Sequence, residues 1–320
     1  MPFDFDAAVL APFRMQPGLR RIAAGTPQLT PIRPGSRHQR EKLAVLSAFW
    51  PRALCAQPGF DAAPALAELC AHAAAEHPGA WAWDGDTATA RWQGVAVARD
   101  GRVARQASGA FGPGDEVARC LQELPAAWRL AGLVALAFAE DFALVDTGTG
   151  CIPWLAVALP SHWAPEDKVG RHFTEVHGPV ADNALLLRAT QGLMRLVAGP
   201  ERWERFVWTV TDHPRLHAHP VHEAPGRWRP RWQDTPVASA WWRTEHQTFI
   251  PLAARGQAWF TIHVELLPLA QAVATPGRAA ALHDALASMS PAVLAYRGLS
   301  TVREPLLAWL RARAAAGGPA

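Results

Sequence analysis

The first 79 residues separate into an irregular arm and two amphipathic helices. Proline and glycine recur through residues 1–40, which indicates a segment without regular structure. Residues 40–54 then place apolar side chains at helical spacing, and Asp61 precedes a second helical run that continues to about residue 75. We therefore predict an N-terminal arm followed by a small helical cap over residues 1–79.

Patterns typical of strands begin at residue 80. Residues 81–92 predict a hairpin that turns at Asp84-Gly85-Asp86, and residues 115–124 predict a short helix. Two longer strands follow at residues 132–145 and 152–159. The turn Gly148-Thr149-Gly150 separates them, so we expect this pair to be antiparallel.

The second half of the chain alternates between helical and strand patterns. Two helices are predicted at residues 165–176 and 182–197, and the tail at 278–314 is helical with a break near 288–291. Strands are predicted at residues 206–210, 238–252 and 258–266. Hairpins with helices inserted between them describe an α+β protein with an antiparallel sheet. We predict a sheet core over residues 80–270 and C-terminal helices over residues 271–320.

Composition and charge narrow the choice of partners. The chain has 320 residues, of which 50% are hydrophobic and 18% are charged, as in a globular enzyme. A net charge of +3 with scattered basic residues gives no reason to expect a nucleic acid partner. The longest apolar stretch, residues 130–138, is far shorter than the roughly 20 residues of a membrane span. The N-terminus shows no signal-peptide pattern, so we expect a cytoplasmic protein that does not enter a membrane.

Cysteine and histidine give only weak indications of a metal site. The four cysteines are far apart and form no Cys-x-x-Cys pair, which argues against a zinc ribbon or an iron–sulfur cluster in this chain. One histidine cluster has spacing that suits zinc or nickel, although its prolines are also typical of an ordinary loop. It comprises His213, His217, His219 and His222. The 15 tryptophans suit a large flat apolar ligand, but they also simply fill cores.

Four stretches in the same order resemble one known family. Residues 159–180 contain Pro-Ser-His-Trp, then Lys-Val-Gly, then His-Gly-Pro-Val. These fit the Pro-Ser-x-Trp, Lys-x-Gly and His-x-Pro-Val hallmarks of the haem-binding subunits typified by haem-dependent oxidative N-demethylase. The Glu-Asp strand at 140–141, the Arg-x-x-Trp strand at 205–208 and the Arg-x-Glu-x-Gln-Thr strand at 243–248 also agree. Two features depart from the family: His246 replaces a commoner Arg, and residues 181–183 replace the usual Pro-Gly.

The resemblance implies a PAS-like sheet that binds haem b through an axial histidine. It also implies electrons from separate flavin and [2Fe-2S] subunits or domains, in the manner of a reductase or ferredoxin. Members of this family oxidise amines with dioxygen, either by removing an N-methyl group or by oxygenating the nitrogen of an amino acid. We therefore expect a haem-dependent amine monooxygenase subunit that lies in the cytoplasm.

His177 is the candidate ligand of the haem iron, since it sits at the end of a predicted helix and neutral imidazole is a common axial ligand. The alternative is a histidine that merely caps the helix. Lys168, Arg205 and Arg243 are candidates for binding the haem propionates, because cations recognise carboxylates. The alternative for each of these is ordinary surface charge.

Glu245 and Thr248 are the candidate catalytic residues. Strand alternation places Arg243, Glu245 and Gln247 on one face and Thr248 on the other. A carboxylate near the haem could hold a protonated amine or relay protons. The alternative for Glu245 is a structural pair with Arg243.

Two other functions remain open at this stage. PAS-type sheets also serve as haem sensors of gases or redox state, although no output domain is visible in the sequence. A member of the family that has lost haem would act as a binding module.

Overall fold

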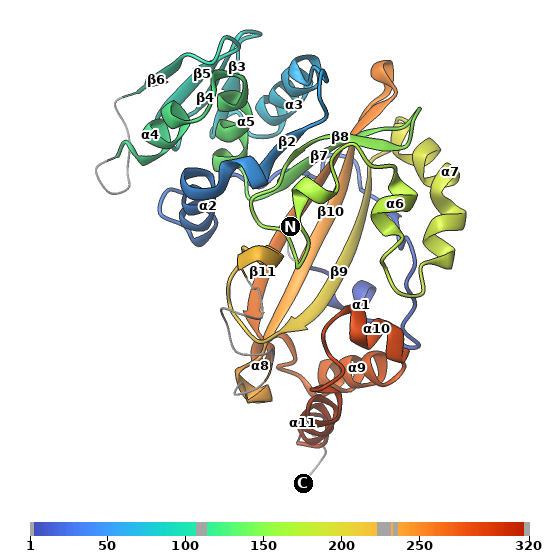
Figure 1. The fold of residues 1–320 in the computed structure, drawn as a ribbon. Helices are drawn as coiled ribbons and strands as arrows, with labels where there is room; N and C mark the ends of the chain where they lie inside the picture. Colours follow the sequence, from blue (N-terminus) through green and yellow to red (C-terminus); the bar gives the residue numbers. More distant parts are fainter. Residues whose placement is uncertain (1–2, 107–113, 223–231, 233–235, 317–320) are drawn as a thin grey trace.

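The computed structural model describes residues 3–106, 114–222, 232 and 236–316. Its centre is a seven-stranded antiparallel sheet in the order β1-β9-β10-β11-β7-β8-β2 (Figure 1). The strands are β1 (Arg20–Arg21), β2 (Leu54–Ala56), β7 (Asp141–Asp146), β8 (Cys151–Ala156), β9 (Trp203–Thr211), β10 (Trp241–Leu252) and β11 (Gln257–Pro268). The α+β class and the antiparallel sheet are confirmed, whereas a PAS-like topology stays a prediction.

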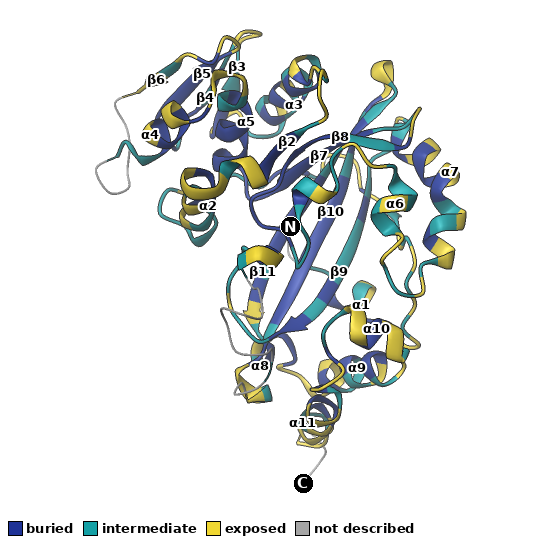
Figure 2. Cartoon of the chain, in the orientation of Figure 1, coloured by how far each residue is buried: buried dark blue, intermediate teal, exposed yellow. Residues whose placement is uncertain are grey.

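The hairpin of β10 and β11 is the longest pairing in the sheet. It pairs Thr248 with Thr261 and Glu245 with Val264. Its connection contains Gly256 at φ +62°, a left-handed conformation that glycine adopts without strain. β10 is buried along nearly its whole length, so both of its faces contribute to the interior (Figure 2). Side chains next to each other on β10 therefore enter opposite environments.

A second sheet of four strands lies beside the first, together with helices from residues 37–137 (Figure 1). It contains β3 (Trp81–Trp83), β4 (Thr87–Ala90), β5 (Val95–Ala98) and β6 (Val103–Arg105). The helices are α2 (Arg37–Ala53), α3 (Ala63–Glu76), α4 (Glu116–Glu123) and α5 (Ala126–Ala137). The predicted hairpin at 81–92 thus belongs to the smaller sheet, while β2 from the predicted cap joins the larger one. The domain boundaries stay a prediction.

Two predicted elements were wrong. The strand expected at 132–145 is the end of α5 followed by β7. Residues 130–137 are all buried, so their apolar run has no polar face to reveal helical spacing. The helix expected at 165–176 consists of a 3₁₀ turn at Pro165–Asp167 and the short helix α6 (Phe173–His177). Gly170 interrupts it at φ +76°, a conformation outside any right-handed helix.

The remaining helices flank the large sheet. α6 and α7 (Ala184–Ala198) lie beside β8 and β9, and the C-terminal helices gather at the opposite end of these strands (Figure 1). The latter are α8 (Leu269–Ala272), α9 (Pro276–Ala287), α10 (Pro291–Tyr296) and α11 (Arg303–Ala315), and α1 (Phe5–Ala8) packs near them. The break predicted near 288–291 separates α9 from α10. Within the described residues, no helix is both long enough and apolar enough to cross a bilayer.

Candidate functional site

A cavity of about 330 Å³ lies between one face of the large sheet and a layer formed by α6, α7 and residues 160–168. Its size falls within the range of small-molecule sites. Most of its wall is apolar, with Leu, Val, Ile, Met, Phe and Trp side chains. The charged or titratable residues on its wall include Lys168, His177, Arg205, Arg243, Glu245 and Arg297. The fold therefore brings five of the predicted site residues together and adds Arg297.

α6 is held against the sheet by its own N-terminus. His172 and Glu175 form a capping box, in which the Thr174 backbone N–H donates to His172 Nδ1 and the His172 backbone N–H donates to Glu175. At the first residue of the helix, the Phe173 N–H donates to the Gly150 carbonyl at 2.8 Å. The His172 ring packs on Gly150 so closely that a Cβ there would lie 2.5 Å from Nε2. The β7–β8 turn thus fixes the position of α6.

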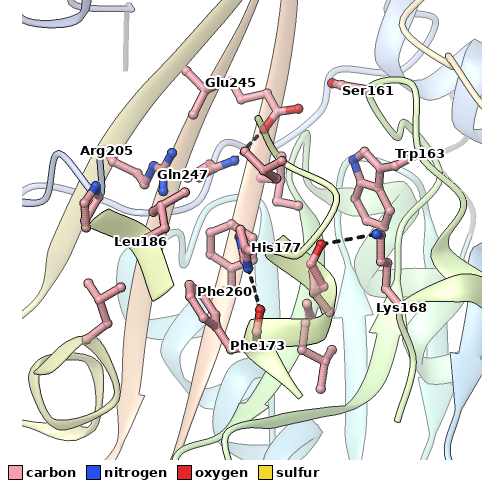
Figure 3. A pocket seen from close by; sticks show the side chains of 18 of the residues that line it. Ser161, Trp163, Lys168, Phe173, His177, Leu186, Arg205, Glu245, Gln247 and Phe260 are labelled. Atoms are coloured by element: carbon pink, nitrogen blue, oxygen red, sulfur yellow. Dashed lines mark hydrogen bonds between the residues drawn. The ribbon is translucent and has the colours of Figure 1, made fainter. Parts of the chain in front are cut away.

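His177 ends this short helix and points into the cavity (Figure 3). Its Nδ1 lies 2.8 Å from the Phe173 carbonyl, which fixes Nδ1 as the protonated nitrogen. The Phe173 ring packs 4.0 Å from the imidazole, centroid to centroid. Burial lowers the pKa of His177 to about 4, and the nearby Arg205 and Lys168 act in the same direction. The imidazole is therefore neutral at physiological pH, and Nε2 makes no hydrogen bond with any described residue.

Lys168 lies on the opposite side of His177 from Arg205 (Figure 3). Its Nζ donates to the Val176 carbonyl at 3.4 Å, close to the C-terminus of α6. Burial lowers the pKa of this ammonium group, although Asp167 opposes the shift. Lys168 therefore supports α6 while leaving further hydrogen-bond donors for an anion.

Arg205 is the least satisfied of the predicted cations. It lies on β9 opposite Gln247, and its Nε is buried with no hydrogen-bond partner among the described residues. Burial lowers the pKa of the guanidinium, and Glu245 only partly offsets this effect. A buried cation without a counter-ion is costly, so the site favours an anionic occupant.

Arg243 has a different environment. Its side chain is 1% exposed and donates to the carbonyls of Arg215, Pro160 and Leu216 at 2.8–3.1 Å, and to the Ser161 hydroxyl at 2.8 Å. These bonds tie residues 159–161 and 215–216 to β10. Arg243 thus holds part of the cavity wall in place.

Glu245 and Gln247 follow Arg243 on the same face of β10. Gln247 Nε2 donates to Glu245 at 2.5 Å, and both side chains face the cavity (Figure 3). Among the described residues, the hydrogen-bond partner of the Glu245 carboxylate is Gln247. Glu245 is therefore a carboxylate held in place by an amide, with room to accept a further donor.

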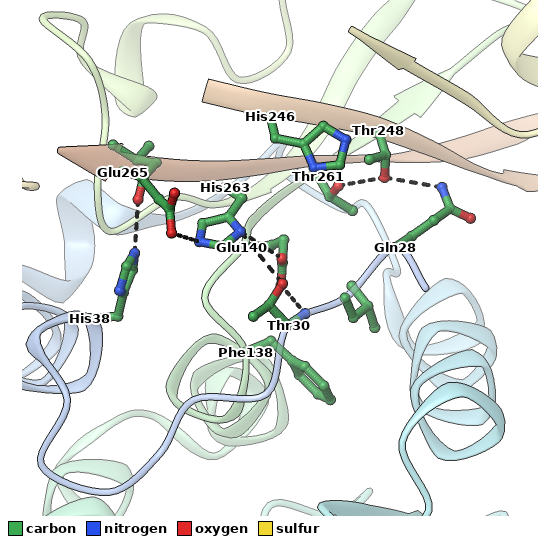
Figure 4. Close-up of polar contacts among 12 residues, drawn as sticks. Gln28, Thr30, His38, Phe138, Glu140, His246, Thr248, Thr261, His263 and Glu265 are labelled. Carbon is green, nitrogen blue, oxygen red and sulfur yellow. Dashed lines mark hydrogen bonds and ion pairs between the residues drawn. The ribbon is translucent and has the colours of Figure 1, made fainter. Parts of the chain in front are cut away.

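Thr248 does not reach the cavity. It lies on the opposite face of β10, where its Oγ1 accepts from Gln28 Nε2 at 3.0 Å and lies 2.7 Å from the Thr261 hydroxyl (Figure 4). Both partners are buried. Alternation along the strand separates Thr248 from Glu245, so the two predicted catalytic residues are not brought together.

Arg297 and Thr209 also line the cavity and were not predicted. Arg297 follows α10, in a tail whose sequence carries no motif for it. Thr209 is one of several threonines in strands, and only the register of β9 reveals which face it takes. In both cases the position of the residue on the cavity wall becomes apparent only from the folded structure.

The histidine cluster is occupied by hydrogen bonds. His217 Nδ1 lies 2.7 Å from the Ala158 carbonyl and its Nε2 lies 2.6 Å from His222. His219 Nε2 lies 3.0 Å from Glu166. Within the described part of the chain, no group of three or more His, Cys, Asp or Glu side chains is arranged to hold a metal ion.

Comparison with known proteins gives one family match. Residues 122–307 match the family model described as haem-dependent oxidative N-demethylase, alpha subunit-like. The matched region covers more than half of the chain and contains every charged residue of the cavity wall, from Lys168 to Arg297.

Proposed function

The chain belongs to the haem-dependent oxidative N-demethylase alpha subunit-like family, and on this premise we propose that it is a haem-b-dependent oxygenase subunit acting on an amine. We propose that its cavity holds the haem and the substrate together. Dioxygen is the second substrate, and a separate flavin and [2Fe-2S] partner supplies the electrons.

The observation that carries this proposal is the hydrogen bond from His177 Nδ1 to the Phe173 carbonyl. Histidines that bind metals commonly donate their other ring N–H to a carbonyl, which fixes the tautomer and the ring orientation. Here that bond places the proton on Nδ1 and leaves Nε2 unprotonated, on a ring that lines the cavity. His177 would therefore be the residue that holds the haem iron.

The other cavity residues fit a flat apolar group with anionic substituents. Trp163, Phe173 and Phe260 contribute apolar surface, whereas Lys168 and Arg205 offer donors that the described residues leave unused. Haem has an apolar macrocycle and two carboxylates. We propose that Lys168 and Arg205 meet the propionates, while Arg243 supports the wall through its carbonyl contacts.

When bound, the haem supplies oxidation by activated dioxygen, and the protein supplies positioning and electrostatics. Glu245 would accept a hydrogen bond from a protonated amine, since it is a carboxylate on the cavity wall. Gln247 holds this carboxylate in one orientation through its bond at 2.5 Å. The apolar wall would keep water away from the reacting groups.

An absorption spectrum after haem reconstitution tests the proposal. The wild type should show a Soret band, and His177→Ala should lose it or shift it, with partial recovery when free imidazole is added. His283→Ala is the matched control, because His283 lies on α9 outside the cavity wall. An unchanged Soret band in His177→Ala would contradict the assignment of the ligand.

Turnover separates the remaining functions. Methylated and primary amines, supplied with dioxygen and a flavin–iron–sulfur reductase, should be oxidised by the wild type and not by Glu245→Gln. A Soret band without any amine oxidation would favour a haem sensor. No Soret band in the wild type would favour a binding module without haem.

A further inference from the structure

Three hydrogen-bonding atoms at the β9 side of the cavity are buried and have no partner among the described residues. They are the Nε of Arg205, the Oγ1 of Thr209 and the Nε of Arg297. Arg205 and Thr209 lie four residues apart on β9, so alternation places both on the same face. Most buried polar atoms in native proteins are paired, so a group of three that line one cavity indicates a missing ligand.

Arg297 is fixed in place although its Nε is unpaired. One of its terminal nitrogens donates to the Trp208 carbonyl. Its guanidinium also lies over the rings of Phe13 and Trp208, at 4.8 and 5.2 Å from their centroids. The side chain is therefore pre-organised, and a ligand would not have to order it.

The two positively charged side chains, Arg205 and Arg297, favour an anionic ligand. Neither Arg205 nor Arg297 forms an ion pair with a carboxylate of the described residues. Burial lowers the pKa of Arg297 to about 10, and Arg205 contributes in the same direction. Glu245 raises the pKa of both arginines, but it makes its hydrogen bond with Gln247. Two guanidinium groups and a hydroxyl offer N–H and O–H donors, which a carboxylate accepts in a planar arrangement.

We propose that Arg205, Thr209 and Arg297 form a carboxylate-binding site along β9. Two sources have this chemistry: a propionate of the bound haem, or a carboxylate on a separate small molecule in the cavity. The first source rests on the proposed function, whereas the second does not depend on haem.

The first arm of the test uses the full-length protein without haem. Propionate should bind to the wild type, and propionamide, which has nearly the same shape but no charge, should not. Arg297→Gln should weaken propionate binding about tenfold or more, because hydrogen bonds to charged groups are lost. Arg195→Gln is the matched control, since it removes the same charge from the exposed surface of α7. Calorimetry or NMR titration gives the affinities.

The second arm compares haem b with its dimethyl ester, in which both propionates are blocked. If the site holds a haem propionate, Arg297→Gln weakens haem b binding about tenfold and leaves the affinity for the ester unchanged. If the carboxylate belongs to another molecule, haem affinity is unchanged by Arg297→Gln, and the haem-loaded wild type still binds propionate. Either result supports the site and identifies its source.

The proposal is overturned if Arg297→Gln and Arg205→Gln alter neither propionate nor haem affinity. Arg297→Lys keeps the positive charge without the planar fork, so it provides a second variant if the glutamine variant does not fold. Circular dichroism establishes folding in each case. If propionate affinity and haem affinity are both unchanged in the arginine variants while the Soret band still depends on His177, this site is rejected and the assignment of His177 stands.

Discussion

Gln247 and Thr248 are neighbours on β10, yet their side chains enter two different environments. On the face of Thr248, polar side chains pair with one another: Gln28 reaches Thr248, and Thr248 reaches Thr261 (Figure 4). On the face of Gln247, Arg205 Nε and Thr209 Oγ1 are buried and find no partner in the part of the chain that the structure describes. The polar groups of the first face therefore find their partners within the protein, whereas these two atoms of the second face are left for a ligand. Both faces of β10 carry polar side chains, and the two faces differ in whether those side chains have hydrogen-bond partners.

The paired face also holds the N-terminal segment to the sheet. Glu140 accepts from the Thr30 N–H at 2.9 Å and lies 3.3 Å from His263 Nδ1 (Figure 4). Both Glu140 and His263 are buried. Because Glu140 accepts from the Thr30 N–H and also lies beside His263, its contribution to stability should be large.

The largest effect is expected for Glu140→Ala. Removing this buried carboxylate leaves the Thr30 N–H and His263 Nδ1 without their acceptor, which should lower the free energy of unfolding by about 3–5 kcal/mol. Glu265→Ala is the matched control, since Glu265 also lies near His263, at 3.6 Å, but is 45% exposed. Urea unfolding measures both. A similar small loss in the two variants would remove the proposed contrast between the faces.

The same carboxylate predicts how stability depends on pH. Hydrogen bonds and the nearby His263 lower the pKa of Glu140 to about 2 against the cost of its burial. A lowered carboxylate pKa adds stability that is complete above the unfolded value and is lost as the pH falls from about 5 to about 2. Unfolding of the wild type should therefore show an extra pH-dependent loss of about 3 kcal/mol in this range. Glu140→Gln should lack that part of the slope.

On the cavity face of the sheet, we expect a substitution to raise the stability of the protein without haem. Arg205→Met replaces a buried cation that has no counter-ion, so the protein without haem should become more stable by about 1–2 kcal/mol. Its affinity for haem b should fall at the same time. Thermal unfolding with and without haem tests both. A destabilised apoprotein would mean that Arg205 is paired in solution and does not await a ligand.

Much of the sheet was predictable from sequence, but the partners of its polar residues were not. Alternation along residues 243–248 correctly placed Glu245 and Thr248 on opposite faces, and the family motifs indicated His177 and Arg205. Arg297 was missed because it reaches the cavity from a helical tail far away in sequence. The burial of Lys42, at 0% exposure, was missed because its partner Asp141 lies on β7, about a hundred positions later.

The smallest and sharpest comparison uses one chemical change on the two faces. Thr248→Val removes a hydroxyl that bonds to Gln28 and Thr261, so stability should fall by about 1 kcal/mol while haem and propionate affinities stay the same. Thr209→Val removes a hydroxyl that has no partner among the described residues, so stability should hold or rise slightly while the affinity for propionate falls. Denaturant unfolding of both variants measures their stability, and titration measures their affinities for haem and propionate. Equal stability losses would show that Thr209 has a partner in the apoprotein.

The contact between Gly150 and His172 means that the β7–β8 turn sets the position of α6, and therefore how far His177 projects into the cavity. A methyl group at position 150 would push the His172 ring outward, and α6 would carry His177 along with it. A change at this buried glycine can thus alter how far the His177 imidazole projects into the cavity, while every cavity side chain keeps its identity. The position of His177 can therefore be adjusted from outside the pocket, at a single small residue.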